Sequence, residues 1–419
     1  MFLNCHSWFS FYYGTMSVEQ LLHEASKQGL KKIALTDINN TSGILDFVRL
    51  APQYGIQPIA GIAFHDGDDL RFIGLAQNNE GYEELNIFLS SCLKTASEKN
   101  QTSGNRDAVI PDRAPIFKNV FVVYPTSAPF LKTVSFESTA FVGKRAQRGE
   151  LMKARASKEK KNPQNALRDY EYIGVREEEL LQIQFSFSPN AYNKCVALCP
   201  VTVRNKTDHN IHRLLTAVGK NELLSRVPAT VFCKEDETFR SEADIRERYK
   251  EYPEIIRNTE TILKNCHLSF DFHKSKNKQC FTGSKELDAA LLKKEAYKGA
   301  TKRYGARLSE KIKTRIEKEL TMIIDLGFCA YFLINWDILR FARKRGFFYV
   351  GRGSGANSMV AYCLGITNVD PIELDLYFER FLNTERTSPP DFDIDFSWKD
   401  RNHIYDYIFS KYGTDHACL

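Results

Sequence analysis

The sequence has no long apolar run. Its longest uncharged stretch, residues 1–18, is interrupted by polar side chains such as Asn4, His6 and Ser7, and no basic segment precedes it. A membrane-spanning helix needs about 20 predominantly apolar residues, and a secretory leader begins with a basic region. We therefore expect a cytoplasmic protein with no membrane partner.

Cysteine pairs at a repeated interval are also missing. The ten cysteines are scattered over 419 residues, whereas disulfide frameworks occur in short secreted chains that are dense in cysteine. We predict reduced thiols that are mostly buried. Cys195, Cys199, His209 and His212 come nearest to a zinc motif, but the loop is short and the two histidines lie too close together for a zinc finger.

A strong charge of either sign is lacking, since 58 basic residues stand against 52 acidic ones and leave a net charge of +6. This balance excludes a histone-like protein. Residues 142–161 hold eight Lys or Arg and two Glu, which is the same surplus of six. The segment is either a solvated insertion or a surface that follows a phosphate backbone, and its composition leaves both interpretations open.

The composition that is present, 43% hydrophobic and 26% charged, is typical of a soluble globular protein. At about 150 residues per domain, the length suggests two or three domains. A polar connector lies near residues 268–284. We therefore place one domain at 1–283, with a basic insertion around 95–170, and another at 284–419.

Helix and strand signals alternate at the start of the chain. Ser17 and Gln20 form a capping-box pattern that predicts a helix ending near Gly29. A strand over 33–35, a helix over 43–54 and a strand over 58–62 follow, which indicates a parallel sheet or barrel. The second domain begins with helices over 287–326, separated at Gly305, and continues helically from 327 to 346.

The strongest chemical signal is the strand predicted over 390–396. Its period of two places Asp391, Asp393 and Asp395 on one face and the alternating apolar residues toward a core. Carboxylates two residues apart lie about 6.5–7 Å from each other along a strand, so a pair of them can hold two divalent ions. The alternative is an exposed face of solvated acids. A metal pair needs only two carboxylates, and Asp395 is the one that it can do without.

A glycine-rich turn precedes this strand. Arg352, Gly353 and Ser354 lie between a strand from Tyr349 and a helix through 359–364, and the first amides of that helix offer further donors for phosphate oxygens. No Lys follows the glycines, so the turn is not a P-loop. A dinucleotide-binding domain starting here would have too few residues left to be complete.

Arg380 and Arg386 lie between the two motifs. They either contact phosphates or pair with the neighbouring glutamates. A glycine-rich turn, arginines and paired acids within so short a stretch suggest phosphoryl or nucleotidyl transfer.

Residues 327–396, from GFCAYFLINWDIL through GRGSGANSMVAYCLGITNVD to PDFDIDF, resemble the palm of bacterial C-family DNA polymerases, the alpha subunit of DNA polymerase III. The resemblance implies that Asp391 and Asp393 are two of three catalytic aspartates that hold two Mg²⁺ ions. It also implies that Arg352, Gly353 and Ser354 handle the incoming dNTP. The family's third aspartate lies further along than Leu419, so we expect a fragment that is inactive alone.

The beginning of the chain resembles the same family's PHP domain, a (βα)7 barrel with a metal-binding phosphoesterase site. MFLNCHSWFSFYYGTMS, IALTDINNTSG, PIAGIAF and LRFIGLAQNNEGYEELN match its motifs. His6 and Asp37 retain the ligand type of the family. The positions that depart from it are Asn4, Tyr13, Ile38, Ala63, Arg71, Pro200 and Thr202. Two ligands do not make a metal site, so we expect a degenerate centre without zinc or phosphoesterase activity.

Together these features predict an α/β protein, a PHP-type (βα)7 barrel followed by an incomplete nucleotidyltransferase-like α+β palm. The predicted function is DNA-directed DNA polymerase activity. The expected partners are primer-template DNA and dNTPs, with a sliding clamp and other replisome subunits binding through parts outside this chain. Two alternatives remain, a PHP-type metal-dependent phosphoesterase and a non-catalytic DNA-binding module.

Overall fold

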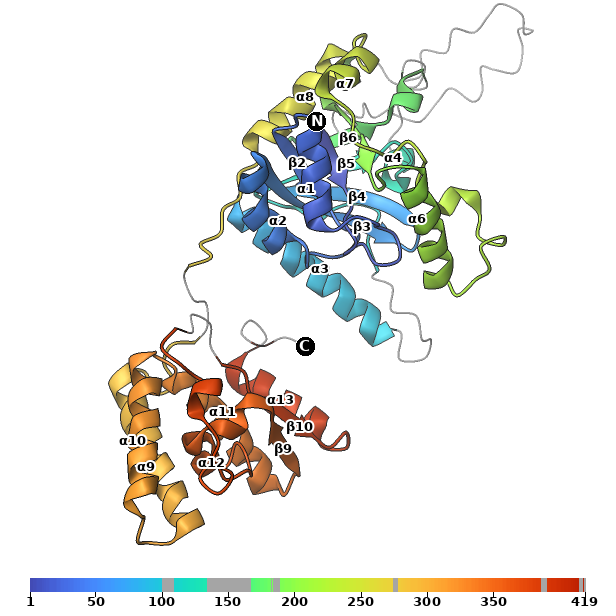
Figure 1. The fold of residues 1–419 in the computed structure, drawn as a ribbon. Coiled ribbons are helices and arrows are strands. Elements are labelled where there is room, and N and C mark those ends of the chain that lie inside the picture. The colour runs from blue at the N-terminus through green and yellow to red at the C-terminus, as the bar shows by residue number, and fades with distance from the viewer. Residues whose placement is uncertain are drawn as a thin grey trace, which may run out of the picture. The chain divides into compact units, whose positions relative to one another are not determined.

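A computed structural model describes residues 1–99, 109–133, 167–181, 183, 189–273, 278–385, 390–413 and 417. The chain divides into two compact units, Met1–His273 and Lys274–Leu419 (Figure 1). This division falls at residue 273, whereas the sequence suggested 283. The basic segment 142–161 and Arg386 lie outside the described residues, so the expectations for them stay predictions.

The first unit is built on a curled, half-barrel sheet of mixed α/β type. Within the described residues this sheet has eight strands in the order β7-β6-β5-β4-β3-β2-β1-β8. The strands are β1 (Phe2–Cys5), β2 (Lys32–Leu35), β3 (Gln57–Asp66), β4 (Asp69–Ala76), β5 (Val120–Pro125), β6 (Glu171–Val175), β7 (Cys195–Ala197) and β8 (Pro200–Val201). This architecture agrees with the predicted PHP-type barrel.

One hairpin departs from the pure βα alternation that the sequence suggested. β3 is longer than the predicted strand 58–62 and turns at Gly67 (φ 61°) into β4, so that β4 runs antiparallel to both β3 and β5. The remaining neighbours in the sheet pair in parallel. The hairpin adds one strand to the expected seven.

Helices pack around this sheet. The predicted capping box is present, because the Ser17 side chain accepts from the Gln20 amide and the Gln20 side chain accepts from the Ser17 amide. α2 packs against β3 and α3 against β4 (Figure 1). α8 packs against β7. The helices are α1 (Val18–Lys27), α2 (Ile44–Leu50), α3 (Asn79–Lys99), α4 (Pro129–Thr133), α6 (Lys206–Gly219), α7 (Glu242–Arg248) and α8 (Pro253–Asn265).

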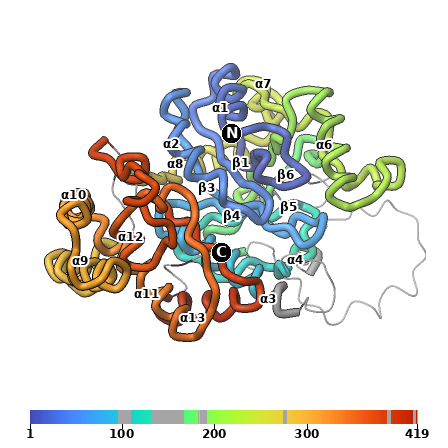
Figure 2. Tube along the Cα trace, turned by 60° about the horizontal axis from the view of Figure 1, so that its bottom comes forward, coloured from blue at the N-terminus to red at the C-terminus, as the bar shows by residue number. Residues whose placement is uncertain are grey.

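The second unit combines helices with a two-stranded antiparallel sheet. Its elements are α9 (Lys285–Tyr304), α10 (Glu310–Asp325), α11 (Cys329–Arg345), β9 (Tyr349–Arg352), α12 (Met359–Leu364), β10 (Asp393–Phe396) and α13 (Arg401–Tyr412). α9 and α10 lie side by side, with α12 against both (Figure 2). The break between α9 and α10 falls at Gly305, as predicted.

Each unit has its own apolar core. In the first unit it includes the fully buried Phe2, Phe47 and Tyr124, and in the second Phe332 and Phe381. Among the described helices, no single one is long and apolar enough to cross a membrane. By length and composition only the pair α10 and α11 passes such a test together, and it is bent by 114°.

Candidate functional site

The predicted acidic strand forms the exposed face of the β9–β10 sheet. Asp393 pairs with Arg352 and Asp395 with Val350 in the antiparallel register. The side chains of Asp393 and Asp395 are 49% and 60% exposed, and Asp391, which comes just before β10, is also exposed. The strand observed here, β10, is shorter than the predicted strand 390–396, and within it Asp393 and Asp395 lie on the exposed face. That Asp391 shares this face stays a prediction.

Phe392 anchors this strand from the opposite side. Its backbone N–H donates to the Tyr331 hydroxyl of α11 at 2.8 Å, and its ring stacks on the Tyr331 ring at 5.4 Å. The rings of Phe332 and Phe381 lie at 5.2 and 5.0 Å from it. Asp391 and Asp393 thus flank a residue that is fixed in the core, which limits how far either carboxylate can move.

The glycine-rich turn lies directly beside these acids. Gly353 has a φ of 77°, and a Cβ at this position would come within 2.9 Å of the Asp393 Oδ2. At Gly355 a Cβ would meet the Phe392 ring at 2.6 Å. Only glycine combines this backbone conformation with so close an approach, so the two sequence motifs meet in one place.

Arg352 reaches across the sheet to the acids. Its Nε donates to the Asp395 Oδ2 at 2.7 Å, and its Nη1 lies 4.0 Å from the Asp393 Oδ2. The guanidinium is 63% exposed, so it remains accessible to a further anion. Arg352 therefore pairs most closely with Asp395 and lies farther from Asp393.

One expectation for the turn is wrong. The first amides of α12 are not open to phosphate, because Met359 N and Val360 N each donate to the buried carboxylate of Glu319 at 3.0 Å. The sequence held a signal for Glu319. It lies on α10 at the spacing of the buried Ile316 and Ile323, so it is a charged residue on the apolar side of that helix.

The arginines between the motifs are only partly placed. Arg380 is exposed in a 3₁₀ turn over Phe378–Arg380. Its neighbour Glu379 pairs with Lys318 of α10. The predicted contact of Arg380 with phosphates stays a prediction.

An exposed carboxylate at the start of β10, with another two residues before it and Arg352 alongside, suits a hard divalent cation. Mg²⁺ takes oxygen ligands and is commonly held by one or two carboxylates together with substrate phosphates. Asp391 and Asp393 fit that donor set, and Arg352 with the turn supplies the positive side of a phosphate site.

At the predicted centre of the barrel, both carboxylate oxygens of Asp37 accept hydrogen bonds. Its Oδ1 accepts from Ser7 N and Ser10 Oγ, both at 2.7 Å, and its Oδ2 accepts from Ser7 Oγ at 2.8 Å. Burial raises the pKa of Asp37, and the hydrogen bonds from Ser10 and Ser7 oppose that shift. The carboxylate therefore serves to hold the loop that follows β1.

His6 joins a second set of buried contacts. Its Nδ1 lies 3.1 Å from Thr202 Oγ1, and the Thr202 hydroxyl donates to Glu237 Oε2 at 2.8 Å. A hydroxyl has one proton to give, so Nδ1 must carry the imidazole proton. The Nε2 atom is buried and has no hydrogen-bond partner among the described residues.

The other expected ligand positions hold no convergent donors. Asn4 accepts from Thr36 Oγ1 at 2.8 Å. Ile38 and Ala63 face each other in an isolated bridge, and Arg71 pairs with Asp66 at 2.7 Å. At Tyr13 the ring lies edge-on to His6 and His212, at 5.4 and 4.6 Å between ring centroids. Pro200 lies in β8.

Across the described part of the chain, no three His, Cys, Asp or Glu side chains come together as a metal site requires. The Nε2 lone pair of His6 remains without a hydrogen bond among the described residues. A single imidazole nitrogen does not replace the several ligands of a PHP metal centre. The two histidines of the zinc-like run make hydrogen bonds to the backbone instead. His212 Nε2 accepts from Cys233 N at 2.9 Å, and His209 Nε2 contacts the Cys233 carbonyl at 3.0 Å.

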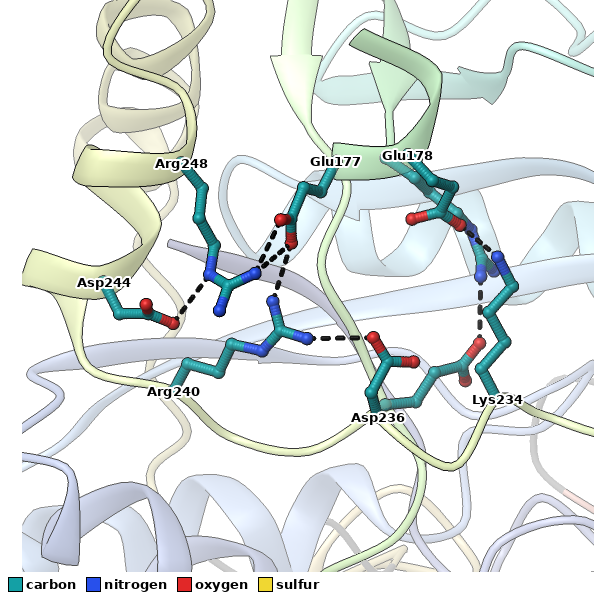
Figure 3. A network of polar contacts seen from close by, with 9 residues as sticks. Glu177, Glu178, Lys234, Asp236, Arg240, Asp244 and Arg248 are labelled. Atoms are coloured by element: carbon teal, nitrogen blue, oxygen red, sulfur yellow. Dashed lines mark hydrogen bonds and ion pairs between the residues drawn. The ribbon is translucent and has the colours of Figure 1, made fainter.

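Sequence reasoning missed the charged network beside this centre. Arg176 donates to Glu237 at 3.0 Å. Next to that pair, Arg248 and Arg240 converge on Glu177 at 2.6 and 2.9 Å, and Arg240 also donates to Asp236 (Figure 3). These groups line a cavity of about 50 Å³ and pair with one another around it.

The comparisons with known proteins agree with both units. The PHP domain matches residues 3–121, and the bacterial DNA polymerase III alpha NTPase domain matches residues 290–419. The chain is 34% identical to an error-prone DNA polymerase of Symbiobacterium thermophilum, over 99% of this chain and 38% of that protein. It is 30% identical to a DNA polymerase III subunit alpha of Buchnera aphidicola, over 99% of this chain and 36% of that protein.

An error-prone DNA polymerase of Burkholderia mallei is 29% identical over the whole chain and 39% of its own length. The two domains define the class, a PHP domain joined to a polymerase III alpha domain. The chain resembles the bacterial DNA polymerase III alpha family over both units, and its relatives are named either error-prone DNA polymerase or DNA polymerase III subunit alpha. It spans about 38% of the length of the curated relatives that it matches.

Proposed function

We propose that this chain supplies the first part of a DNA-directed DNA polymerase, in which Asp391 and Asp393 hold the catalytic metal and the neighbouring turn binds the dNTP. The observation that carries the proposal is the contact between the two motifs. Gly353 lies against the Asp393 carboxylate, and Arg352 lies on the same face of the sheet.

The chemistry follows from charge. When two Mg²⁺ ions are bound, they stabilise the attacking primer 3′-oxygen and the leaving pyrophosphate. Asp391 and Asp393 provide their oxygen ligands, while Arg352 and the turn at Gly353 and Ser354 orient the triphosphate. The substrates are then primer-template DNA and dNTPs. We propose a cytoplasmic site of action, with a sliding clamp and other replisome subunits as further partners.

The test is primer extension by a polymerase that carries this sequence. We expect Asp391→Asn to lower nucleotide incorporation by about a thousandfold, because metal ions contribute several kcal/mol to such a transition state. Primer-template binding should persist. Asp325→Asn is the matched control, since Asp325 is exposed at the end of α10. Near-normal extension by the Asp391 variant would refute the assignment.

For the barrel unit we propose that no catalytic metal binds and that phosphoesterase activity is absent. Support comes from Asp37, whose oxygens are taken by Ser7 and Ser10, and from the apolar pair at Ile38 and Ala63. The test is metal analysis of the chain carrying Asp391→Asn and Asp393→Asn, after dialysis against Zn²⁺ or Mn²⁺. Stoichiometric metal in that variant would restore the phosphoesterase alternative.

A further inference from the structure

Glu319 occupies a place that the chemistry of the site leaves unexplained. It lies on α10, its side chain is 0% exposed, and it points beneath the junction of the glycine-rich turn and α12. One carboxylate oxygen accepts from Ser358 Oγ at 2.9 Å and Val360 N at 3.0 Å, and the other accepts from Met359 N at 3.0 Å. A carboxylate is therefore already bound where α12 begins.

Arg315 completes this arrangement from one turn earlier on α10. Its Nε donates to Glu319 at 2.6 Å, and its Nη2 donates to the carbonyls of Asn357 at 3.0 Å and Leu376 at 2.8 Å. The guanidinium thus links the last residue of the turn to the segment that leads toward Arg380. The planar fork of an arginine makes such divergent contacts possible, which a lysine does not.

Burying an ion pair is costly unless its hydrogen bonds are complete. Burial raises the pKa of Glu319, while Arg315 and the amides of Val360 and Met359 lower it. The pair has three backbone donors and acceptors on the turn and α12 in addition to each other. Its net effect is to specify one conformation of residues 353–360, because any other would leave a buried charge without partners.

We propose that Glu319 and Arg315 are positioning residues for the triphosphate, which fix the turn so that Gly353 lies beside Asp393. The inference rests on the proposed function of this turn. By occupying the amides of Met359 and Val360, Glu319 also keeps an incoming phosphate from binding one turn too far along. The phosphate-binding donors are then confined to Arg352 and the turn itself.

The experiment measures binding of inorganic tripolyphosphate and of dATP to the 419-residue chain by titration calorimetry, in the presence of Mg²⁺. We expect Glu319→Gln to raise the dissociation constant of both about tenfold. The matched control is Glu310→Gln, since Glu310 lies on the same helix with its side chain 85% exposed. Mn²⁺ binding to Asp391 and Asp393, followed by electron paramagnetic resonance, should change less than twofold, because that site is held by Phe392.

Selective loss of triphosphate binding separates positioning from a general structural defect, which would weaken Mn²⁺ binding as well. In primer extension the same variant should raise KM for dNTP about tenfold and leave kcat within about twofold. If Glu319→Gln weakened the binding of tripolyphosphate and of Mn²⁺ equally, the inference would be overturned. An unchanged dissociation constant for tripolyphosphate would overturn it as well. If Glu319→Gln does not fold, Arg315→Lys provides the same comparison with the positive charge retained.

Arg352→Ala distinguishes this inference from the proposed function. If the unaltered chain binds tripolyphosphate and Arg352→Ala weakens it, while Glu319→Gln does not, only the positioning role fails. If the unaltered chain does not bind tripolyphosphate or Arg352→Ala has no effect, the assignment of the turn fails and the positioning role fails with it.

Discussion

Buried polar residues in both units find their partners far along the chain. His6 contacts Thr202 in the first unit, and Glu319 contacts Ser358 in the second. Each pair joins segments that are distant in sequence, and all four residues are buried. A buried polar group without such a partner costs about 1–3 kcal/mol, so these contacts specify the fold more than they add to its stability.

The buried histidines make the first unit sensitive to acid. Burial lowers the pKa of His6 from 6.5 to about 3, and burial also lowers that of His212. The His6 imidazole stays neutral in the folded state between pH 6.5 and 5 and takes up a proton in the unfolded state below pH 6.5. Stability is therefore full above pH 6.5 and falls as the pH decreases, by at most about 1.4 kcal/mol per pH unit for His6, and the shift of His212 acts in the same direction.

We expect the free energy of unfolding, measured by urea denaturation with circular dichroism, to fall between pH 6.5 and 5 for the transition of the first unit. His6→Asn should remove the contribution of one titrating imidazole from the slope of the free energy of unfolding against pH. The comparison variant is His23→Asn, whose imidazole is 57% exposed. A free energy that stays level over this pH range would contradict the assignment of neutral, buried imidazoles.

At the residue scale, the sequence predicted groups whose neighbours in sequence reveal them. The alternation around Phe392 predicted that Asp391 and Asp393 are exposed while Phe392 packs inward, and their exposures agree with this. The partner of Glu319 was not predictable, because Ser358 is 39 residues away and only the packing of α10 on α12 brings them together. For the same reason the roles of Arg176 and Glu237 were missed.

At the scale of elements, close packing between helices depends on single glycines. Gly299 of α9 lies against the carbonyl of Cys363 in α12, and a Cβ there would come within 1.9 Å of that oxygen. A backbone atom cannot rotate away as a side chain can. The position of α12 relative to α9, and with it the end of the glycine-rich turn, is set by this contact.

Gly299→Ala should therefore destabilise the second unit by roughly 1–3 kcal/mol, although alanine is the better helix former. The measurement is the urea midpoint of that unit's unfolding transition. Lys302→Ala is the control, because Lys302 is exposed on the same helix. A midpoint equal to or above that of the unaltered chain would show that the two helices can separate without cost.

Elements with local signals were predicted well and those without them were not. The Ser17 cap, the break at Gly305 and the helix over 359–364 agree with the structure. The β3–β4 hairpin was missed, because the strand continues past Ile62 through His65 and Asp66. Polar residues that are paired across a hairpin look like a loop when the partner strand is unknown.

At the scale of the whole molecule, the two units have separate cores. One is centred on residues such as Phe47 and Phe64, and the other on Phe332 and Leu333. Units with their own cores can fold independently. From its polar connector the sequence suggested a boundary at 283, whereas the structure divides at 273.

We expect residues 1–273, expressed alone, to unfold in one cooperative transition whose thermal midpoint matches one of the two transitions of the whole chain. Gly299→Ala in the whole chain should move the other transition only. Differential scanning calorimetry gives both midpoints. A single transition of the whole chain that Gly299→Ala shifts entirely would show that the units unfold as one body.

The register of β9 and β10 has a further consequence for how this chain tolerates change in length. Asp393 stands opposite Arg352, and Ile394 stands opposite Gly351. Because side chains alternate between faces, inserting one residue after Phe392 would turn the acids inward and the apolar residues outward. Point substitutions on the exposed face alter one group at a time, whereas a single inserted or deleted codon at this point would exchange the two faces of the strand together.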